Sequence, residues 1–102
     1  MAELATLFRW RVANAVRVAF EADWRIITEA LLEQGSSGSA LFDAGDGVLC
    51  ALARWPDTAT RDRAFAVLAD DPRVAALRRH DAEPLERRDM TLIADLWKLP
   101  DA

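Results

Sequence analysis

The sequence predicts an α+β domain in which a four-stranded antiparallel sheet carries two helices on one face. Three observations predict this class. Apolar residues alternate along the first segment, then recur every three or four residues, and two later extended segments are separated by turn-forming residues. Followed along the chain, the order is strand, helix, strand, strand, helix, strand, which is the split β-α-β arrangement of ferredoxin-like folds.

The first strand and the first helix are defined by apolar spacing. Over residues 7–12, Phe8, Trp10 and Val12 fall on one side of an extended chain, with arginines on the other side. A helical face then collects apolar side chains at spacings of four, four, three and four: Val16, Phe20, Trp24, Ile27 and Leu31. Gly35 is expected to end this helix.

The rest of the chain is predicted to form two strands, a second helix and a last strand. Residues 39–42 and 48–55 are expected to pair as antiparallel strands, because residues 43–47 have hairpin-loop composition. Asp57 is placed to cap a second helix, which carries Phe65 and Leu68 inward and restarts at Pro72 with Val74 and Leu77 inward. Residues 90–97 are expected to form the last strand.

Length and composition indicate one globular domain over residues 1–102. The chain has 102 residues, 52% hydrophobic and 29% charged, and a net charge of −4. An acidic balance argues against nucleic acid as a partner, and no stretch is long and apolar enough for a signal peptide or a membrane span. A single cysteine fits a reducing compartment, so we expect a cytoplasmic protein.

The predicted sheet has apolar residues on both faces, and two helices cover only one. Leu49, Ala51, Ala53 and Trp55 alternate with Val48, Cys50 and Leu52. We therefore expect a homodimer in which the uncovered sheet faces pack together. Arg9 and Arg11 lie on that less apolar side of the first strand. Either they form ion pairs with Glu86 or Asp89 at the dimer interface, or they line an anion-recognising pocket.

The stretch from Ala51 to Asp57, with the sequence ALARWPD, precedes a helix that contains Ala64 and Phe65. It resembles the strand-to-helix junction of the antibiotic biosynthesis monooxygenase family, and the length and element order are similar over nearly the whole chain. The resemblance implies a dimeric α/β barrel with a pocket between helices and sheet in each subunit. It also implies one of two activities, which are cofactor-independent oxygenation of aromatic polyketides and oxidative degradation of haem.

Departures from the family pattern concern both activities. Quinone-forming members use an asparagine, a tryptophan and a tyrosine near the junction, whereas this chain lacks tyrosine and matches only Trp55. Haem degraders use an axial histidine at the position that aligns with Leu77, with His80 one turn further on. Since leucine cannot ligate iron, haem degradation is the third choice.

The candidate site residues follow from these considerations. Trp55 and His80 are the catalytic candidates, and Trp10, Trp24, Trp55 and Phe65 are the candidates for binding substrate. Four of them have a plainer interpretation: Trp10, Trp24 and Trp55 as packing residues, and His80 as a solvated residue at a helix end. No cofactor is expected, and no metal site, because one histidine and one cysteine lack the paired spacing of zinc ligands.

The sequence thus leaves two functions open. The first is a cofactor-independent monooxygenase acting on a small aromatic or polyketide-like substrate. The alternative is a non-catalytic dimer that binds a small ligand or serves as a stress-related accessory protein.

Overall fold

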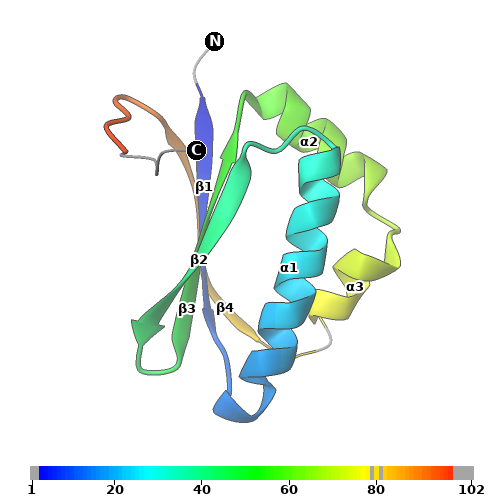
Figure 1. Ribbon diagram of the computed structural model, residues 1–102, viewed down its shortest axis with the longest axis vertical. Helices are drawn as coiled ribbons and strands as arrows, with labels where there is room; N and C mark the ends of the chain where they lie inside the picture. Colours follow the sequence, from blue (N-terminus) through cyan, green and yellow to red (C-terminus); the bar gives the residue numbers. More distant parts are fainter. Residues whose placement is uncertain (1–2, 79, 81, 98–102) are drawn as a thin grey trace, which may run out of the picture.

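The structure, a computed structural model, describes residues 3–78, 80 and 82–97, without the side chains of residues 77 and 78. The predicted order of elements is confirmed. The elements are β1 (Leu4–Arg11), a short 3-10 turn η1 (Asn14–Val16), α1 (Arg17–Glu33), β2 (Gly38–Gly45), β3 (Val48–Trp55), α2 (Thr58–Val67), α3 (Pro72–Arg78) and β4 (Glu83–Thr91). The four strands form one antiparallel sheet in the order β2-β3-β1-β4, and all three helices lie on one side of it (Figure 1).

The helix-covered face of the sheet is built by alternate residues of the two central strands. Along β3, Leu49, Ala51, Ala53 and Trp55 are buried, whereas Cys50 and Leu52 between them are half-buried. One buried cluster joins Leu4, Trp55 and Ala64 at one end of this face, and another joins Val12, Phe20 and Leu49 at the other end. The core therefore lies between sheet and helices, as the alternation predicts.

Local signals in the sequence fix the turns and the helix starts. Asp46 and Gly47 both have positive φ, at 54° and 77°, which is the two-residue hairpin turn that an Asp-Gly pair favours. Asp57 Oδ1 accepts a hydrogen bond from the Thr60 N–H at 2.7 Å and caps α2. Asp71 Oδ1 accepts one from the Arg73 N–H at 2.8 Å at the start of α3.

The prediction for the last strand was wrong. β4 occupies residues 83–91 rather than 90–97, and residues 92–97 form no strand. Pro84 lies within β4, which is an edge strand with a solvent side, where a residue without an N–H group is tolerated. The ladder ends where Leu4, the first residue of β1, pairs with Thr91, so the following residues have no partner strand.

The face of the sheet turned away from the helices, hereafter the outer face, carries the two arginines. Arg9 Nη1 lies 3.6 Å from Glu86 Oε1, and Arg11 Nε lies 3.8 Å from Glu83 Oε2. The expected ion pair with Glu86 is therefore present for Arg9, Arg11 pairs with Glu83, which was not a predicted partner, and neither arginine lines the main cavity. Asp89, the other expected partner, faces the helices instead, where it contacts Thr6 and Arg61.

Candidate functional site

A cavity of about 350 Å³ lies between α1 and the helix-covered face of the sheet. Its walls are mostly aromatic and aliphatic, and the polar groups of the described lining side chains are hydroxyls and tryptophan indole N–H groups. The aromatic members are Phe8, Trp10, Phe20, Trp24, Trp55 and Phe65, and the hydroxyl members are Thr28, Ser36 and Ser39. This is the composition of a site for a small, mainly apolar molecule.

Small residues at the middle of β3 leave the space open. Ala51 and Ala53 lie between Leu49 and Trp55 in the same helix-facing row, and both alanines line the cavity. A methyl side chain reaches only a short way above the sheet, so α1 and the flanking rings cannot fill the gap. The cavity therefore follows from the alternation of large and small residues along one strand.

The aromatic walls are held in place by contacts between rings. Phe8 and Trp10 are stacked with ring centroids 5.6 Å apart, and Phe20 and Trp10 meet edge-to-face with centroids 5.4 Å apart. At the other end of the cavity, Trp55 and Phe65 are 6.0 Å apart. Offset and edge-to-face pairs of this kind add stability beyond area burial. The walls are therefore in place before any guest enters.

All four residues expected to bind substrate line the cavity: Trp10, Trp24, Trp55 and Phe65. The two interpretations of the tryptophans do not exclude each other. Trp55 is 1% exposed and belongs to the buried core, yet part of its surface faces the cavity. Trp10 and Trp24 are half-buried beside the second core cluster.

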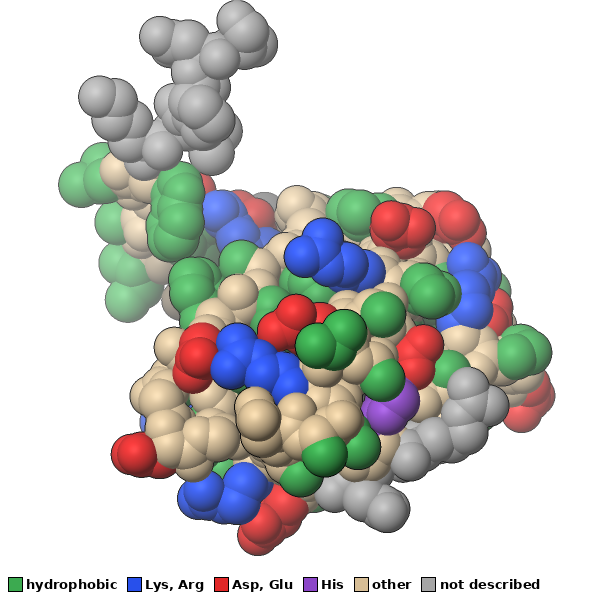
Figure 2. Space-filling model, turned by 60° about the horizontal axis from the view of Figure 1, so that its bottom comes forward, with side chains coloured by type: hydrophobic (Ala, Val, Ile, Leu, Met, Phe, Trp, Pro, Cys, Tyr) green, Lys and Arg blue, Asp and Glu red, His purple; other side chains and the backbone are tan. Residues whose placement is uncertain are grey.

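His80, the second catalytic candidate, lies outside the cavity. Its Nε2 atom is 2.5 Å from Asp23 Oδ2 on α1, and its ring and that of Phe20 meet edge-to-face with centroids 6.2 Å apart. Figure 2 shows the imidazole in purple at the surface, with apolar side chains around it. The interpretation as a solvated residue at a helix end was wrong, because the side chain is only 15% exposed and pairs with α1. Phe20 separates it from the cavity.

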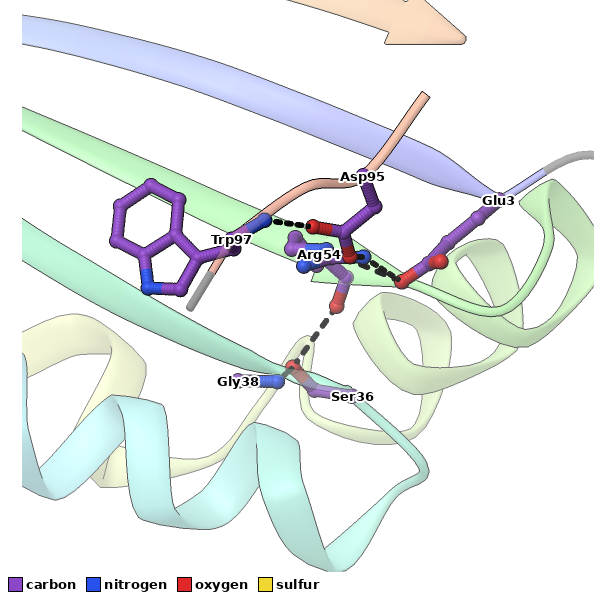
Figure 3. Close-up of polar contacts among 6 residues, drawn as sticks. All are labelled: Glu3, Ser36, Gly38, Arg54, Asp95 and Trp97. Carbon is purple, nitrogen blue, oxygen red and sulfur yellow. Dashed lines mark hydrogen bonds and ion pairs between the residues drawn. The ribbon is translucent and has the colours of Figure 1, made fainter. Parts of the chain in front are cut away.

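The hydroxyl of Ser36 is already used inside the protein. Ser36 Oγ donates to the Arg54 carbonyl at 3.3 Å and accepts from the Gly38 N–H at 3.0 Å (Figure 3). On the outer face, the Arg54 side chain contacts Glu3 and Asp95. Thr28 and Ser39 form no side-chain hydrogen bond with any described residue, so their hydroxyls are available to a guest.

Sequence reasoning missed some residues of the cavity. Phe8 and Phe20 were placed correctly on inward faces but were treated only as core. Thr28 follows Trp24 by four residues, so helical spacing could have placed it on the same face. Leu77, which stands where haem degraders have their axial histidine, has a side chain outside the described part of the structure.

Two negative findings concern the described residues alone. No helix in this part of the chain is long and apolar enough to cross a lipid bilayer. No group of three or more histidine, cysteine, aspartate or glutamate side chains among residues 3–78, 80 and 82–97 is arranged to hold a metal ion.

Comparison with known proteins identifies the fold. No family model and no curated protein matches the sequence. Among solved structures, SnoaB, a cofactor-independent oxygenase from Streptomyces nogalater, superposes with a TM-score of 0.80 at 22% identity, covering 96% of this chain and 100% of SnoaB. An antibiotic biosynthesis monooxygenase matches with a TM-score of 0.65 at 14% identity, over 90% of this chain and 98% of that one.

A conserved protein of unknown function from Bacteroides thetaiotaomicron is also similar. It matches with a TM-score of 0.75 at 13% identity, over 89% of this chain and 98% of that one. At such identities the likeness establishes the fold. The predicted ferredoxin-like arrangement of the antibiotic biosynthesis monooxygenases is confirmed.

Proposed function

We propose that this protein is a cofactor-independent monooxygenase that acts on a small, planar, electron-rich aromatic substrate bound between α1 and the sheet. The observation that carries the proposal is the aromatic-walled cavity of about 350 Å³. The fold shared with SnoaB, which is a cofactor-independent oxygenase, supports the reaction type. Because fold alone does not determine function, the proposal depends mainly on the shape and composition of the cavity.

In this reaction the substrate supplies the electrons. An electron-rich ring carbon loses two hydrogens and gains one atom of dioxygen as a carbonyl, while the other oxygen atom leaves as water. The substrate gives up four electrons, and dioxygen takes up four. The protein contributes the stacking surfaces of Trp10, Trp24 and Trp55, the hydroxyls of Thr28 and Ser39 as orienting groups, and exclusion of bulk water.

One observation favours a second candidate, a non-catalytic small-ligand-binding protein. None of the described residues that line the cavity is titratable, so a substrate proton would have to leave through a hydroxyl, through water or from the substrate itself. A binding protein needs the same walls and no proton acceptor. Haem degradation is not supported by any feature of this cavity.

The proposal includes a homodimer formed through the outer face. Leu7 and Leu52 are paired neighbours in β1 and β3 on this face, and both are half-buried in the single chain. None of the helices in the described part of the chain lies on that side of the sheet (Figure 1). A second copy would bury this face by two-fold symmetry, as expected from the sequence.

Oxygen uptake tests the proposal. The purified protein is mixed with a hydroxylated anthrone, and oxygen consumption, product and hydrogen peroxide are measured. We expect one dioxygen consumed per carbonyl formed, without peroxide. Binding without uptake, measured as quenching of tryptophan fluorescence, would favour the binding protein, and the absence of both would contradict both functions.

Two variants connect any activity to the cavity. Ala53→Phe places a ring in the open space and should abolish binding and turnover. Thr28→Val keeps the shape but removes a hydroxyl, so we expect binding within a fewfold of the parent and slower turnover. Thr58→Val, at an exposed position in the first turn of α2, is the matched control and should change neither.

A further inference from the structure

We propose that Arg87 forms an anion-recognition site at the edge of the cavity, so that the natural guest is an aromatic anion rather than a neutral aromatic molecule. This inference deepens the proposed function and rests on the cavity being a binding site. Arg87 lies on β4 directly opposite Phe8 of β1, on the helix-covered face. It was not among the candidate residues from the sequence.

The guanidinium of Arg87 lies against two rings of the cavity wall. Its Cζ atom is 5.7 Å from the centroid of Phe8 and 5.9 Å from the centroid of Phe65. Both distances are within the range in which a cation is attracted to an aromatic ring. Because Phe8 and Phe65 both line the cavity, these contacts hold the cation at its border.

A shallow groove continues from the cavity at this point. Asp62, Leu68, Ala69 and Arg87 line the groove, which shares Phe65 and Val74 with the cavity. Arg87 therefore lies where the apolar interior meets a more open surface. A guest with its ring among the tryptophans could place a charged group beside this guanidinium.

The carboxylates of this region are engaged by another arginine. Arg61 Nη2 lies 3.2 Å from Asp62 Oδ1, and Arg61 Nη1 lies 2.8 Å from Asp89 Oδ1. No described carboxylate lies within 4.0 Å of the Arg87 guanidinium. Among the residues that the structure describes, none occupies the donors of Arg87, and a guanidinium binds oxyanions with two parallel hydrogen bonds.

The next residue offers a matched comparison. Arg88 is also exposed, but it points to the outer face, and its Nη2 atom lies 2.9 Å from Glu86 Oε2. Removing the charge at position 88 changes net charge as much as removing it at position 87. Only the change at position 87 occurs at the cavity.

Two fluorescent probes of similar size test the charge preference. 8-Anilinonaphthalene-1-sulfonate carries an anionic sulfonate, and N-phenyl-1-naphthylamine is the same aromatic amine without it. We expect the parent protein to bind both, with Arg87→Gln weakening the sulfonate about 10-fold or more and the neutral amine less than twofold. Arg88→Gln should leave both affinities within twofold. The Arg87→Lys variant should recover part of the sulfonate affinity, because it keeps the charge but loses the fork geometry.

The outcomes separate this inference from the proposed function. Probe fluorescence that remains in the Ala53→Phe variant comes from binding outside the cavity. If the fluorescence of both probes remains in this variant, the cavity is not a binding site and both proposals fail. If the cavity binds both probes and Arg87→Gln weakens both equally, or neither, the anion site is disproved and the cavity proposal stands. Loss confined to the sulfonate supports the anion site.

Discussion

At the scale of single residues, a buried guanidinium ties α2 to the sheet. Arg61 on α2 is buried, and its Nη1 atom forms an ion pair with Asp89 of β4. Nη1 has no aligned hydrogen bond among the described residues, so the contact is chiefly electrostatic. Asp89 Oδ1 also accepts a hydrogen bond from the buried Thr6 hydroxyl at 3.0 Å. Loss of the Asp89 carboxylate would leave the Arg61 guanidinium without this ion-pair partner and the Thr6 hydroxyl without its hydrogen-bond acceptor.

We therefore predict that Asp89→Asn destabilises the protein in a pH-dependent way. The Arg61 guanidinium holds the pKa of Asp89 below its ordinary value of 3.8. A carboxylate with a lowered folded-state pKa contributes stability above its unfolded pKa and loses it as pH falls through the folded value. At pH 7 we expect the variant to lose about 1–3 kcal/mol in free energy of unfolding.

Urea denaturation at a series of pH values measures this effect. The stability difference between the parent and Asp89→Asn should be constant above about pH 5 and should shrink as the pH falls below about 4. Glu29→Gln, which neutralises an exposed carboxylate on α1, should differ little from the parent at either pH. A difference for Asp89→Asn that is the same at pH 7 and pH 2 would contradict the ion-pair account.

The position of Asp89 also marks a limit of sequence reasoning at this scale. Glu86 and Asp89 were equal candidates for the arginines, because residues 83–89 were not predicted as a strand and were assigned to neither face of the sheet. Pairing to β1 shifts between Arg9 and Trp10, so Arg9 is opposite Glu86 and Trp10 is opposite Pro84. Such a bulge changes the face of the sheet on which the residues beyond it lie. The position of the bulge depends on pairing between β1 and β4, which are more than seventy residues apart in the sequence.

At the scale of elements, α2 depends on its first residues. The helix has ten residues and lacks a strong apolar stripe, with Arg61 and Ala64 as its buried members. A short helix of this kind needs its N-cap more than a long one does. The Asp57 cap also comes directly after Trp55 and Pro56, so it fixes where the helix leaves the cavity end of β3.

We predict that Asp57→Ala lowers the free energy of unfolding by about 0.5–2 kcal/mol, measured by urea denaturation at pH 7. The change removes the side-chain acceptor for the Thr60 N–H. Asp70→Ala removes an exposed aspartate that follows the same helix and makes no such cap, and it should cost less than 0.5 kcal/mol. Equal effects of the two changes would show that the cap contributes no stability.

The elements that could be predicted were those with local signals. Each of these signals lies within a few residues of the feature it specifies. They are the caps at Asp57 and Asp71, the glycine after α1 and the Asp-Gly turn. In Gly35 the local and tertiary requirements coincide, because its φ is 103° and a Cβ atom there would lie 2.9 Å from Thr60 Cγ2. β4 lacks such a signal: it is charged, and it is a strand because β1 offers an unpaired edge.

At the scale of the whole molecule, apolar surface remains exposed on the side of the sheet without helices. Phe42 and Met90 on the outer face are 45% and 36% exposed. Beyond β4, Ile93 and Leu96 are almost fully exposed in a segment that Asp95 holds to Arg54 of the outer face (Figure 3). A chain of 102 residues buries only about two thirds of its unfolded surface, so covering this side would add to its stability.

We predict that Leu52→Glu converts a homodimer into a monomer. Leu52 lies in the central strand β3, paired with Leu7 of β1, so a two-fold interface would bury the new carboxylate from both copies. We expect dimer affinity to fall by about 100-fold or more, measured by light scattering after size-exclusion chromatography over a concentration series. Val18→Glu, at an exposed position on α1, is the control and should remain dimeric.

The cysteine of the outer face gives an independent measurement. Cys50 is half-buried in the single chain and lies on the outer face of β3, next to Leu52 in the same row and opposite Arg9 of β1. In a dimer formed through this face, maleimide labelling of Cys50 should slow as protein concentration rises through the dissociation constant, and Leu52→Glu should remove that dependence. If the parent protein is dimeric but Cys50 labels at the same rate in monomer and dimer, the two copies meet through another surface, and the outer face is not the interface.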